Sequence, residues 1–328
     1  MNFLITGGAG YIGSHFVNKL LRERKDIKII VVDNFSQGRK NIIKNRRVIY
    51  YEVDICDQSN LEKIFLNHEI NIVVHFAALA SVPDSVKNPS EYYVNNIIGG
   101  LVLLNVMLKN NVKKIVFSSS ASVYGEPISE FINEDDPKIP TNPYGRTKLI
   151  FEQILYDYHR AYKMNSISFR YFCAAGCDES GVVGEWHNPE THVIPSIIET
   201  LFGKRDMFYI FGTDYSTHDG SGIRDYIHVN DLASAHLSAA EKLMRTEELC
   251  AIYNLGINKG FSVLELIGAV EKITDRKISY EVRARRPGDP SRLIADASKV
   301  MKELNWLPTY TSIETIIETS LNYFKKIQ

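Results

Sequence analysis

Paired cysteines and metal-binding histidine motifs are missing from this 328-residue sequence. The four cysteines, at positions 56, 173, 177 and 250, form no CxxC pair, and Cys173 and Cys177 have no further ligands at zinc spacing. The nine histidines include no HExxH motif. We therefore expect reduced thiols, no metal site and a cytoplasmic location.

Long apolar runs and an excess of charge of one sign are also missing. The longest apolar stretch, residues 97–108, is too short to span a bilayer and contains an asparagine, which favours a buried helix. The first residues lead directly into a strand and a turn, without the basic segment and cleavage site of a signal peptide. A formal net charge of −1 argues against a broad nucleic-acid-binding face. We expect neither a membrane nor a nucleic acid as partner.

What is present is an alternation of short β-branched runs with longer helical patterns. The runs are almost continuously apolar, which is typical of strands that are covered by helices on both faces. The alternation predicts an α/β fold with a doubly wound parallel sheet of the Rossmann type. The expected strands are 2–6, 28–33, 48–53, 71–76, 114–120 and 166–172, and the expected helices are 12–24, 59–68, 90–110 and 144–163.

The rhythm changes after Phe172, where a loop-like stretch rich in glycine and polar residues begins. Helical patterns and short strands follow, which predicts a smaller C-terminal α+β region. We therefore divide the chain into a nucleotide-binding domain, 1–172, with a return segment at about 222–255, and a substrate domain, 173–328. The later helices are expected at 194–203, 262–274, 297–304 and 312–326, and the strands include 251–255 and 278–282.

A glycine triplet, Gly7, Gly10 and Gly13, follows the first expected strand and opens a helix. Such a loop lets the backbone approach a pyrophosphate, whose charge the helix N-terminus stabilises. Asp33 ends the second strand, where a carboxylate can bind the adenosine ribose and would repel a 2′-phosphate. Asp54 follows the third strand, within reach of an adenine edge. NAD is therefore the predicted cofactor; the alternatives are a structural turn and a surface aspartate.

Tyr144 and Lys148 lie four residues apart at the start of an expected helix, so they share one of its faces. With 18 tyrosines in the chain, roughly one such pair is expected by chance. Ionising a phenol near pH 7 costs about 4 kcal/mol, and a lysine ammonium together with the cationic ring of NAD⁺ can supply part of it. Ser120, at the end of the fifth strand, could bind a substrate oxygen beside Tyr144. Together these residues predict a proton-transfer site.

These motifs resemble the extended branch of the short-chain dehydrogenase/reductase superfamily. The glycine loop and Tyr-Lys motif are found across that superfamily. Later motifs resemble the UDP-glucose 4-epimerases more specifically, and the resemblance covers nearly the whole chain. The segments that carry it include TGGAGYIGSH, HFAALASVPDSVKNPSEYYVNN, FSSSASVYG, NPYGRTK, GEWHNPETHVIP, DGSGIRDYIHVNDLA and RRPGDPSRLIADASK.

The resemblance implies an isomerase that interconverts UDP-glucose and UDP-galactose through a transient 4-keto sugar, with bound NAD as hydride shuttle. It implies that Tyr144 is the base, that Lys148 lowers the pKa of Tyr144 and that Ser120 holds the sugar 4-oxygen. It also implies a homodimer that packs through helices 90–110 and 144–163. The implied cofactor contacts are Gly7, Gly10, Tyr11, Ile12, Gly13, Asp33, Asn34, Asp54, Ile55, Phe76, Ala77, Asn95 and Phe172. The implied substrate contacts are Ser120, Tyr144, Cys173, His192, Arg224, Arg286, Asp289 and Leu293.

Several positions depart from the family pattern. Cys173 stands where an asparagine is usual, and Ala80 where many relatives carry a basic residue. His192 resembles one subgroup. Leu293 replaces a tyrosine that narrows the sugar pocket in some relatives, which predicts some tolerance of N-acetylated UDP-sugars.

Other functions of the same fold remain open. A sugar-nucleotide 4,6-dehydratase or decarboxylase shares the Tyr-Lys pair, but dehydratases carry an Asp-Glu pair after the strand-five hydroxyl, where this chain has Ala121 and Ser122. A non-catalytic NAD-binding sensor would not need the catalytic pair. The two arginines, Arg224 and Arg286, could be ordinary surface salt-bridge partners.

Overall fold

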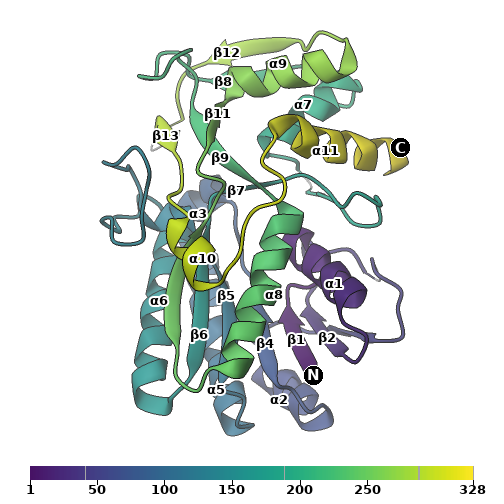
Figure 1. The fold of residues 1–328 in the computed structure, drawn as a ribbon, viewed down its shortest axis with the longest axis vertical. Helices are drawn as coiled ribbons and strands as arrows, with labels where there is room; N and C mark the ends of the chain where they lie inside the picture. The colour runs from purple at the N-terminus through teal and green to yellow at the C-terminus, as the bar shows by residue number, and fades with distance from the viewer. Residues whose placement is uncertain (41, 188, 287–288, 328) are drawn as a thin grey trace.

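The computed structural model describes residues 1–40, 42–187, 189–286 and 289–327. Its larger layer is a seven-stranded sheet in the order β10-β6-β5-β4-β1-β2-β3 (Figure 1). Every neighbouring pair in this sheet is parallel, which confirms the predicted doubly wound sheet. The strands are β1 (Asn2–Thr6), β2 (Lys28–Asp33), β3 (Val48–Glu52), β4 (Ile72–His75), β5 (Lys114–Ser120), β6 (Asn165–Tyr171) and β10 (Cys250–Leu255).

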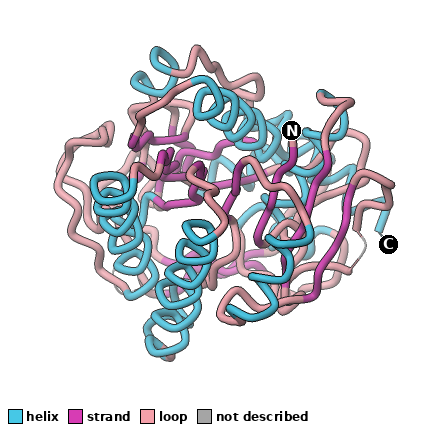
Figure 2. The backbone as a smooth tube through the Cα atoms, turned by 90° about the horizontal axis from the view of Figure 1, so that it is seen from below, coloured by secondary structure: helices cyan, strands magenta, loops and turns pink. Residues whose placement is uncertain are grey.

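Helices cover both faces of this sheet, as Figure 2 shows. Alternate residues of one strand pack on opposite faces: Phe3 and Ile5 join the core beside α1 and α8, whereas Leu4 joins the core beside α2, α5 and α6. This two-sided burial explains why the strands read as continuous apolar runs. The helices are α1 (Tyr11–Glu23), α2 (Gln58–Asn67), α5 (Gly99–Lys109), α6 (Pro143–Tyr162) and α8 (Val229–Arg245).

The segment expected as one helix over 90–110 is divided. It comprises α4 (Pro89–Tyr93), a π-helical turn η1 (Val94–Ile98) and α5, after a short α3 (Val82–Lys87). The π turn contains two asparagines, and the second, Asn96, is buried and bonded to the backbone of Leu79. Because such turns widen the helix by one residue, they often aim side chains at functional sites.

The edge strand β10 was expected among the later short strands, but it pairs with β6 in the large sheet. The chain reaches it through α8, which packs against α1 on one face. By contrast β9 (Ile223–His228), within the expected return segment, pairs with β7 (Cys173–Ala175), β11 (Gly260–Ser262) and β13 (Arg292–Leu293) in a smaller sheet. The division into domains at Phe172 stays a prediction.

Whereas α10 and η2 pack against the large sheet and its helices, most of the remaining elements lie on the side of the smaller sheet (Figure 1). A two-stranded parallel sheet, β8 (Phe208–Phe211) with β12 (Tyr280–Arg283), lies in the same region. The remaining helices are α7 (Val193–Leu201), α9 (Val263–Thr274), α10 (Ser298–Glu303), α11 (Ile313–Ile327) and a 3₁₀ turn η2 (Ala121–Val123). Within the described part of the chain, no helix is both long and apolar enough to cross a membrane.

Candidate active site

The glycine loop between β1 and α1 has no room for a side chain at Gly7 or Gly13. Gly7 has a φ of 67°, and a Cβ there would lie 2.6 Å from the Ala77 nitrogen. A Cβ on Gly13 would lie 2.2 Å from the Gly7 oxygen, so α1 can pack against the loop only with glycine at this position. At Gly10, the residue before α1, a Cβ would meet only the Gly7 oxygen, at 3.4 Å. The loop therefore leaves an approachable backbone concavity at a helix N-terminus, which fits a pyrophosphate.

The first residues of α1 complete this concavity. Gly10 offers no side chain to cap the first-turn amides of Tyr11, Ile12 and Gly13, so these N–H groups are available to an anion. The Tyr11 hydroxyl donates to the Gly176 oxygen at 2.6 Å, which ties the start of α1 to the chain after β7.

The predicted adenosine-binding residues meet at the ends of β2 and β3. The buried Asp33 carboxylate accepts hydrogen bonds from the backbone of Ala9 (3.0 Å) and Phe35 (2.8 Å), which hold it beside the glycine loop. Burial raises the pKa of Asp33, and these two bonds oppose the rise. The Asn34 amide donates to Asp54 Oδ2 at 2.9 Å. Long-range pairing of the strands thus brings three predicted contacts together.

The other predicted cofactor residues lie after the ends of β3, β4 and β6 and in the π turn η1. The Phe76 ring points into the core, where its centroid lies 4.8 Å from that of His236, so only its backbone faces the loop. Ile55 is 4% exposed. Asn95 donates to Asn96 Oδ1 at 2.8 Å, and Asn96 in turn donates to Thr147 at 3.0 Å. Ala77 follows β4, and Phe172 follows β6, where its N–H donates to the Leu255 oxygen at 3.1 Å.

The three predicted catalytic residues lie where β5 ends and α6 begins. Asn142 caps α6 by accepting from the Gly145 N–H at 2.8 Å, and this cap places Tyr144 in the first turn. Ser120, the last residue of β5, is close enough to the Tyr144 phenol to lower its pKa. The Lys148 ammonium lies 5.7 Å from the centroid of the Tyr144 ring and donates to the Ser118 oxygen at 2.7 Å.

Burial dominates the electrostatics of this group. It raises the pKa of Tyr144, against the hydrogen bond from Ser120, which lowers it. The same burial lowers the pKa of Lys148 to about 7, although the nearby Glu152 carboxylate raises it. The chain without cofactor therefore holds a neutral phenol beside a lysine that titrates near neutrality, and its lysine does not by itself acidify the tyrosine.

Sequence reasoning missed Glu152, whose charge acts on Lys148, and Arg170, which pairs with Glu152. Glu152, one helical turn after the lysine, forms a buried ion pair with Arg170 of β6, at 2.7 Å from Nη2 to Oε2 and 3.0 Å from Nε to Oε1. Arg170 also donates to the hydroxyl of Tyr124 at 2.8 Å. The i, i+4 spacing of Lys148 and Glu152 was the available signal for a charge beside the lysine. Only the fold shows that Glu152 is buried and paired with Arg170.

Two of the predicted diphosphate-binding residues lie together. The guanidinium of Arg224, on β9, forms an ion pair with the Asp289 carboxylate, and Arg224 Nη1 donates to the Ile223 oxygen at 2.8 Å. The Arg286 oxygen accepts a hydrogen bond from the Asp289 N–H at 3.2 Å, while the Arg286 guanidinium lies 3.9 Å from the centroid of the Phe211 ring. Arg224 is thus in an ion pair, but its side chain is only 14% exposed and is not the surface partner of the alternative interpretation. Its binding to a diphosphate stays a prediction.

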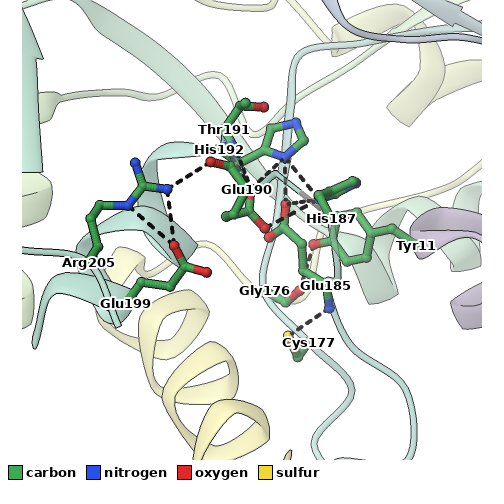
Figure 3. A network of polar contacts seen from close by, with 10 residues as sticks. All are labelled: Tyr11, Gly176, Cys177, Glu185, His187, Glu190, Thr191, His192, Glu199 and Arg205. Carbon is green, nitrogen blue, oxygen red and sulfur yellow. Dashed lines mark hydrogen bonds and ion pairs between the residues drawn. The ribbon is translucent and has the colours of Figure 1, made fainter. Parts of the chain in front are cut away.

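The other predicted substrate residues come from three elements. Cys173 begins β7, where burial raises the pKa of its thiol to about 11, so it is uncharged near neutral pH. Leu293 pairs with Arg224 across β13 and β9 and packs against a buried cluster that includes Phe172. His192 precedes α7, and its Nδ1 lies 3.0 Å from Glu185 Oε1 (Figure 3). Ala80, which stands where many relatives carry a basic residue, follows β4 and is exposed.

Comparison with known proteins places this geometry in a family. The family model described as GDP-mannose 4,6 dehydratase matches residues 4–319. The chain is 48% identical, over 99% of its length and 96% of the relative, to the UDP-glucose 4-epimerase of Halalkalibacterium halodurans. The UDP-glucose 4-epimerase of Brucella ovis, solved in complex with NAD, is 40% identical with a TM-score of 0.94, covering 98% of each chain. That of Bifidobacterium longum, solved with NAD⁺ and UDP, is 41% identical with a TM-score of 0.93, covering 99% of this chain and 98% of that one. The chain therefore belongs to the UDP-glucose 4-epimerase family, within the extended short-chain dehydrogenases/reductases.

Proposed function

We propose that this protein is an NAD-dependent isomerase that interconverts UDP-glucose and UDP-galactose at C4 through a transient 4-keto sugar. The observation that carries the proposal is the placement of Ser120 and Lys148 beside the half-buried phenol of Tyr144 at the C-terminal edge of the sheet. Ligands of open α/β sheets bind at this edge. Relatives that are 40–48% identical to the chain over nearly its full length are named UDP-glucose 4-epimerase.

The glycine loop is the proposed site of the dinucleotide. The backbone cradle at Gly7, Gly10 and Gly13 fits a pyrophosphate, and the Asp33 carboxylate fits the ribose hydroxyls of NAD rather than the phosphate of NADP. When bound, NAD supplies a hydride acceptor and donor, so that the reaction involves no net oxidation. The other proposed contacts are Tyr11, Ile12, Asn34, Asp54, Ile55, Phe76, Ala77, Asn95 and Phe172.

We assign proton transfer to Tyr144. Its phenolate form would take the proton of the sugar 4-hydroxyl and return it after the 4-keto sugar has presented its other face. Ser120 holds the 4-oxygen, and its hydrogen bond favours the ionised phenol. The Lys148 ammonium, buried within 5.7 Å of the ring, favours the phenolate whenever it is protonated. The positive charge of the oxidised nicotinamide acts in the same direction as Lys148.

We place the UDP-sugar against the smaller sheet. Arg224 and Arg286 offer guanidinium groups to the diphosphate, and their planar forks suit phosphate oxygens. Asp289 is the proposed partner of the uridine ribose. Cys173, His192 and Leu293 are the remaining proposed substrate contacts.

Dehydration of the sugar is not favoured by the residues present. The matched family model has the description GDP-mannose 4,6 dehydratase. Loss of water across C5 and C6, however, needs an acid and a base of its own. After Ser120 the chain continues with Ala121, which is 5% exposed, and Ser122, in a 3₁₀ turn without a carboxylate. Besides the hydride carrier, epimerisation requires a single proton-transfer group, the Tyr144 phenol, and it therefore fits the site better.

The deciding experiment incubates the purified protein with UDP-galactose without added NAD and follows UDP-glucose by chromatography. We expect conversion by the unaltered chain and its loss in Tyr144→Phe. Tyr280→Phe is the matched control, because Tyr280 is 44% exposed on β12, far along the chain from the site. Full turnover by Tyr144→Phe would contradict the assignment, and retained NAD without turnover on any nucleotide sugar would favour a sensor.

We further propose a homodimer in the cytoplasm. Val94 and Ile98 are 45% and 51% exposed on the helical segment 89–109, and such apolar surface favours an interface with a second copy. Light scattering should give twice the chain mass, with Ile98→Glu shifting the mass toward the monomer; a monomeric unaltered chain would refute the dimer.

Cell fractionation tests the compartment. Expression of 1–172 with and without 222–255 tests the proposed domain division.

A further inference from the structure

A cluster of titratable side chains lies in the loop that leads into α7, outside the proposed catalytic group. Two carboxylates and two imidazoles converge there, and their ligand atoms all lie within 4.8 Å of one another (Figure 3). The order along the chain is Glu-x-His-x-x-Glu-x-His, which matches no common zinc spacing. This explains why the sequence analysis predicted no metal. We propose that this cluster binds one divalent cation of the zinc class through Glu185, His187, Glu190 and His192.

The separations within the cluster suit a cation better than direct hydrogen bonds. The two histidine Nδ1 atoms are 3.3 Å apart. His187 Nδ1 lies 3.7 Å from Glu185 Oε1 and 3.4 Å from Glu190 Oε2. Zinc bound tetrahedrally at about 2.1 Å from each ligand separates its ligand atoms by about 3.4 Å. Most of the distances between the ligand atoms lie near that value, whereas good N–H···O hydrogen bonds are shorter.

One carboxylate oxygen of the cluster accepts no hydrogen bond, which supports a bound cation. The Glu185 side chain is only 3% exposed, yet its Oε1 atom receives no hydrogen bond. His192 Nδ1 lies 3.0 Å from this oxygen and forms an ion pair with it when the imidazole is protonated. A single proton shared between the two Nδ1 atoms would leave Glu185 Oε1 without a partner. A cation would be bound by both imidazole lone pairs and both carboxylates at once.

The surroundings hold the ligands in position. The backbone N–H groups of Thr191 and His192 donate to Glu190 Oε1 at 2.8 and 2.7 Å, and outer contacts of this kind orient metal ligands. The Glu185 N–H donates to Cys177 Sγ at 3.3 Å. His192 remains 53% exposed, which provides an entry path for the ion. Four protein ligands close the coordination sphere, so the site is structural, and in it His192 serves as a metal ligand rather than as a substrate contact. The ion would tie Glu185 and His187 to Glu190 and His192, just before α7.

The test uses the full-length protein after treatment with a chelator and dialysis. Zinc is titrated alone in a calorimeter, and cobalt is added separately as a spectroscopic probe. We expect one equivalent of zinc per chain and the intense visible bands of tetrahedral cobalt. No zinc binding, or the weak spectrum of octahedral cobalt, would overturn the proposal.

Variants then locate the site. His187→Asn should weaken zinc binding by more than about 100-fold, since loss of a ligand exceeds the 10–100-fold effect of losing an outer partner. Glu190→Gln is a second ligand variant in case the first does not fold, which circular dichroism detects. His218→Asn is the matched control: His218 is 54% exposed beside Asp219 and Glu265, but outside the cluster. Equal weakening by His218→Asn, or unchanged binding in both folded ligand variants, would refute the assignment. Because the readout is metal binding, these results are independent of epimerase activity.

Discussion

The buried ion pair between Glu152 and Arg170 offers the sharpest prediction about the catalytic lysine. Both side chains are nearly inaccessible, at 2% and 3% exposure. Replacement of Glu152 by glutamine leaves the Arg170 charge buried without its partner. Loss of one member of a buried pair costs about 3–5 kcal/mol, so Glu152→Gln should lower the free energy of unfolding by that amount in urea titrations.

The same substitution should change the pH profile of activity. The Glu152 carboxylate raises the pKa of Lys148, which burial has lowered to about 7. Without that charge the pKa of Lys148 falls further, so the ammonium is lost at lower pH. The alkaline limb of kcat/KM for UDP-galactose should therefore move to lower pH. Glu62→Gln is the control, because Glu62 pairs with Lys109 on the surface and contacts no catalytic residue.

A double substitution separates the charge effect from simple loss of packing. Changing Glu152 and Arg170 together to methionine removes both charges, and buried pairs replaced by apolar residues often lose little stability. The double variant should be more stable than Glu152→Gln. The reasoning fails if Glu152→Gln unfolds at the same urea concentration as the unaltered chain, or if its alkaline limb does not move.

Three further outcomes are expected. The pKa of Lys148 is about 7 in the folded chain against 10.5 in the unfolded one, so the unfolded chain binds more protons between these values and stability rises with pH there. Urea titrations of nucleotide-free protein at pH 7 and 9 should show this rise reduced in Lys148→Met; an unchanged rise would contradict the low pKa. Gly13→Ala places a Cβ 2.2 Å from the Gly7 oxygen and should abolish co-purification of NAD, whereas Gly268→Ala, with nothing within 4 Å, should retain it; equal NAD content would refute the cradle. Leu293→Tyr should remove conversion of UDP-N-acetylglucosamine and keep that of UDP-galactose; no conversion by the unaltered chain at saturating substrate would exclude the predicted tolerance.

Local features of the chain were predictable from sequence. The strands of the large sheet and the helices that cover it follow from apolar runs and helical periodicity, and their observed ends agree within one or two residues at most positions. Tyr144 and Lys148 share a helix face because residues four apart always do. The glycine loop was recognisable because its backbone conformation restricts the residue type at Gly7 and Gly13.

Contacts between distant segments were decided by the fold alone. The placement of β10 beside β6, the π turn at Asn96 and the pairing of Glu152 with Arg170 each depend on segments that the sequence does not mark as neighbours. Burial also has an effect that spacing along the helix did not predict: desolvation of the phenol raises the pKa of Tyr144 in the chain by itself.

The amino-acid sequence alone therefore determined the order of strands and helices, the glycine loop and the residues available for proton transfer, because these depend on conformational preference and on spacing along one helix. Tertiary structure decided which charges are buried together, including the Glu185 cluster, and in which direction each pKa moves. The physical reason is that desolvation and charge pairing depend on distances in space, which only the packed chain defines.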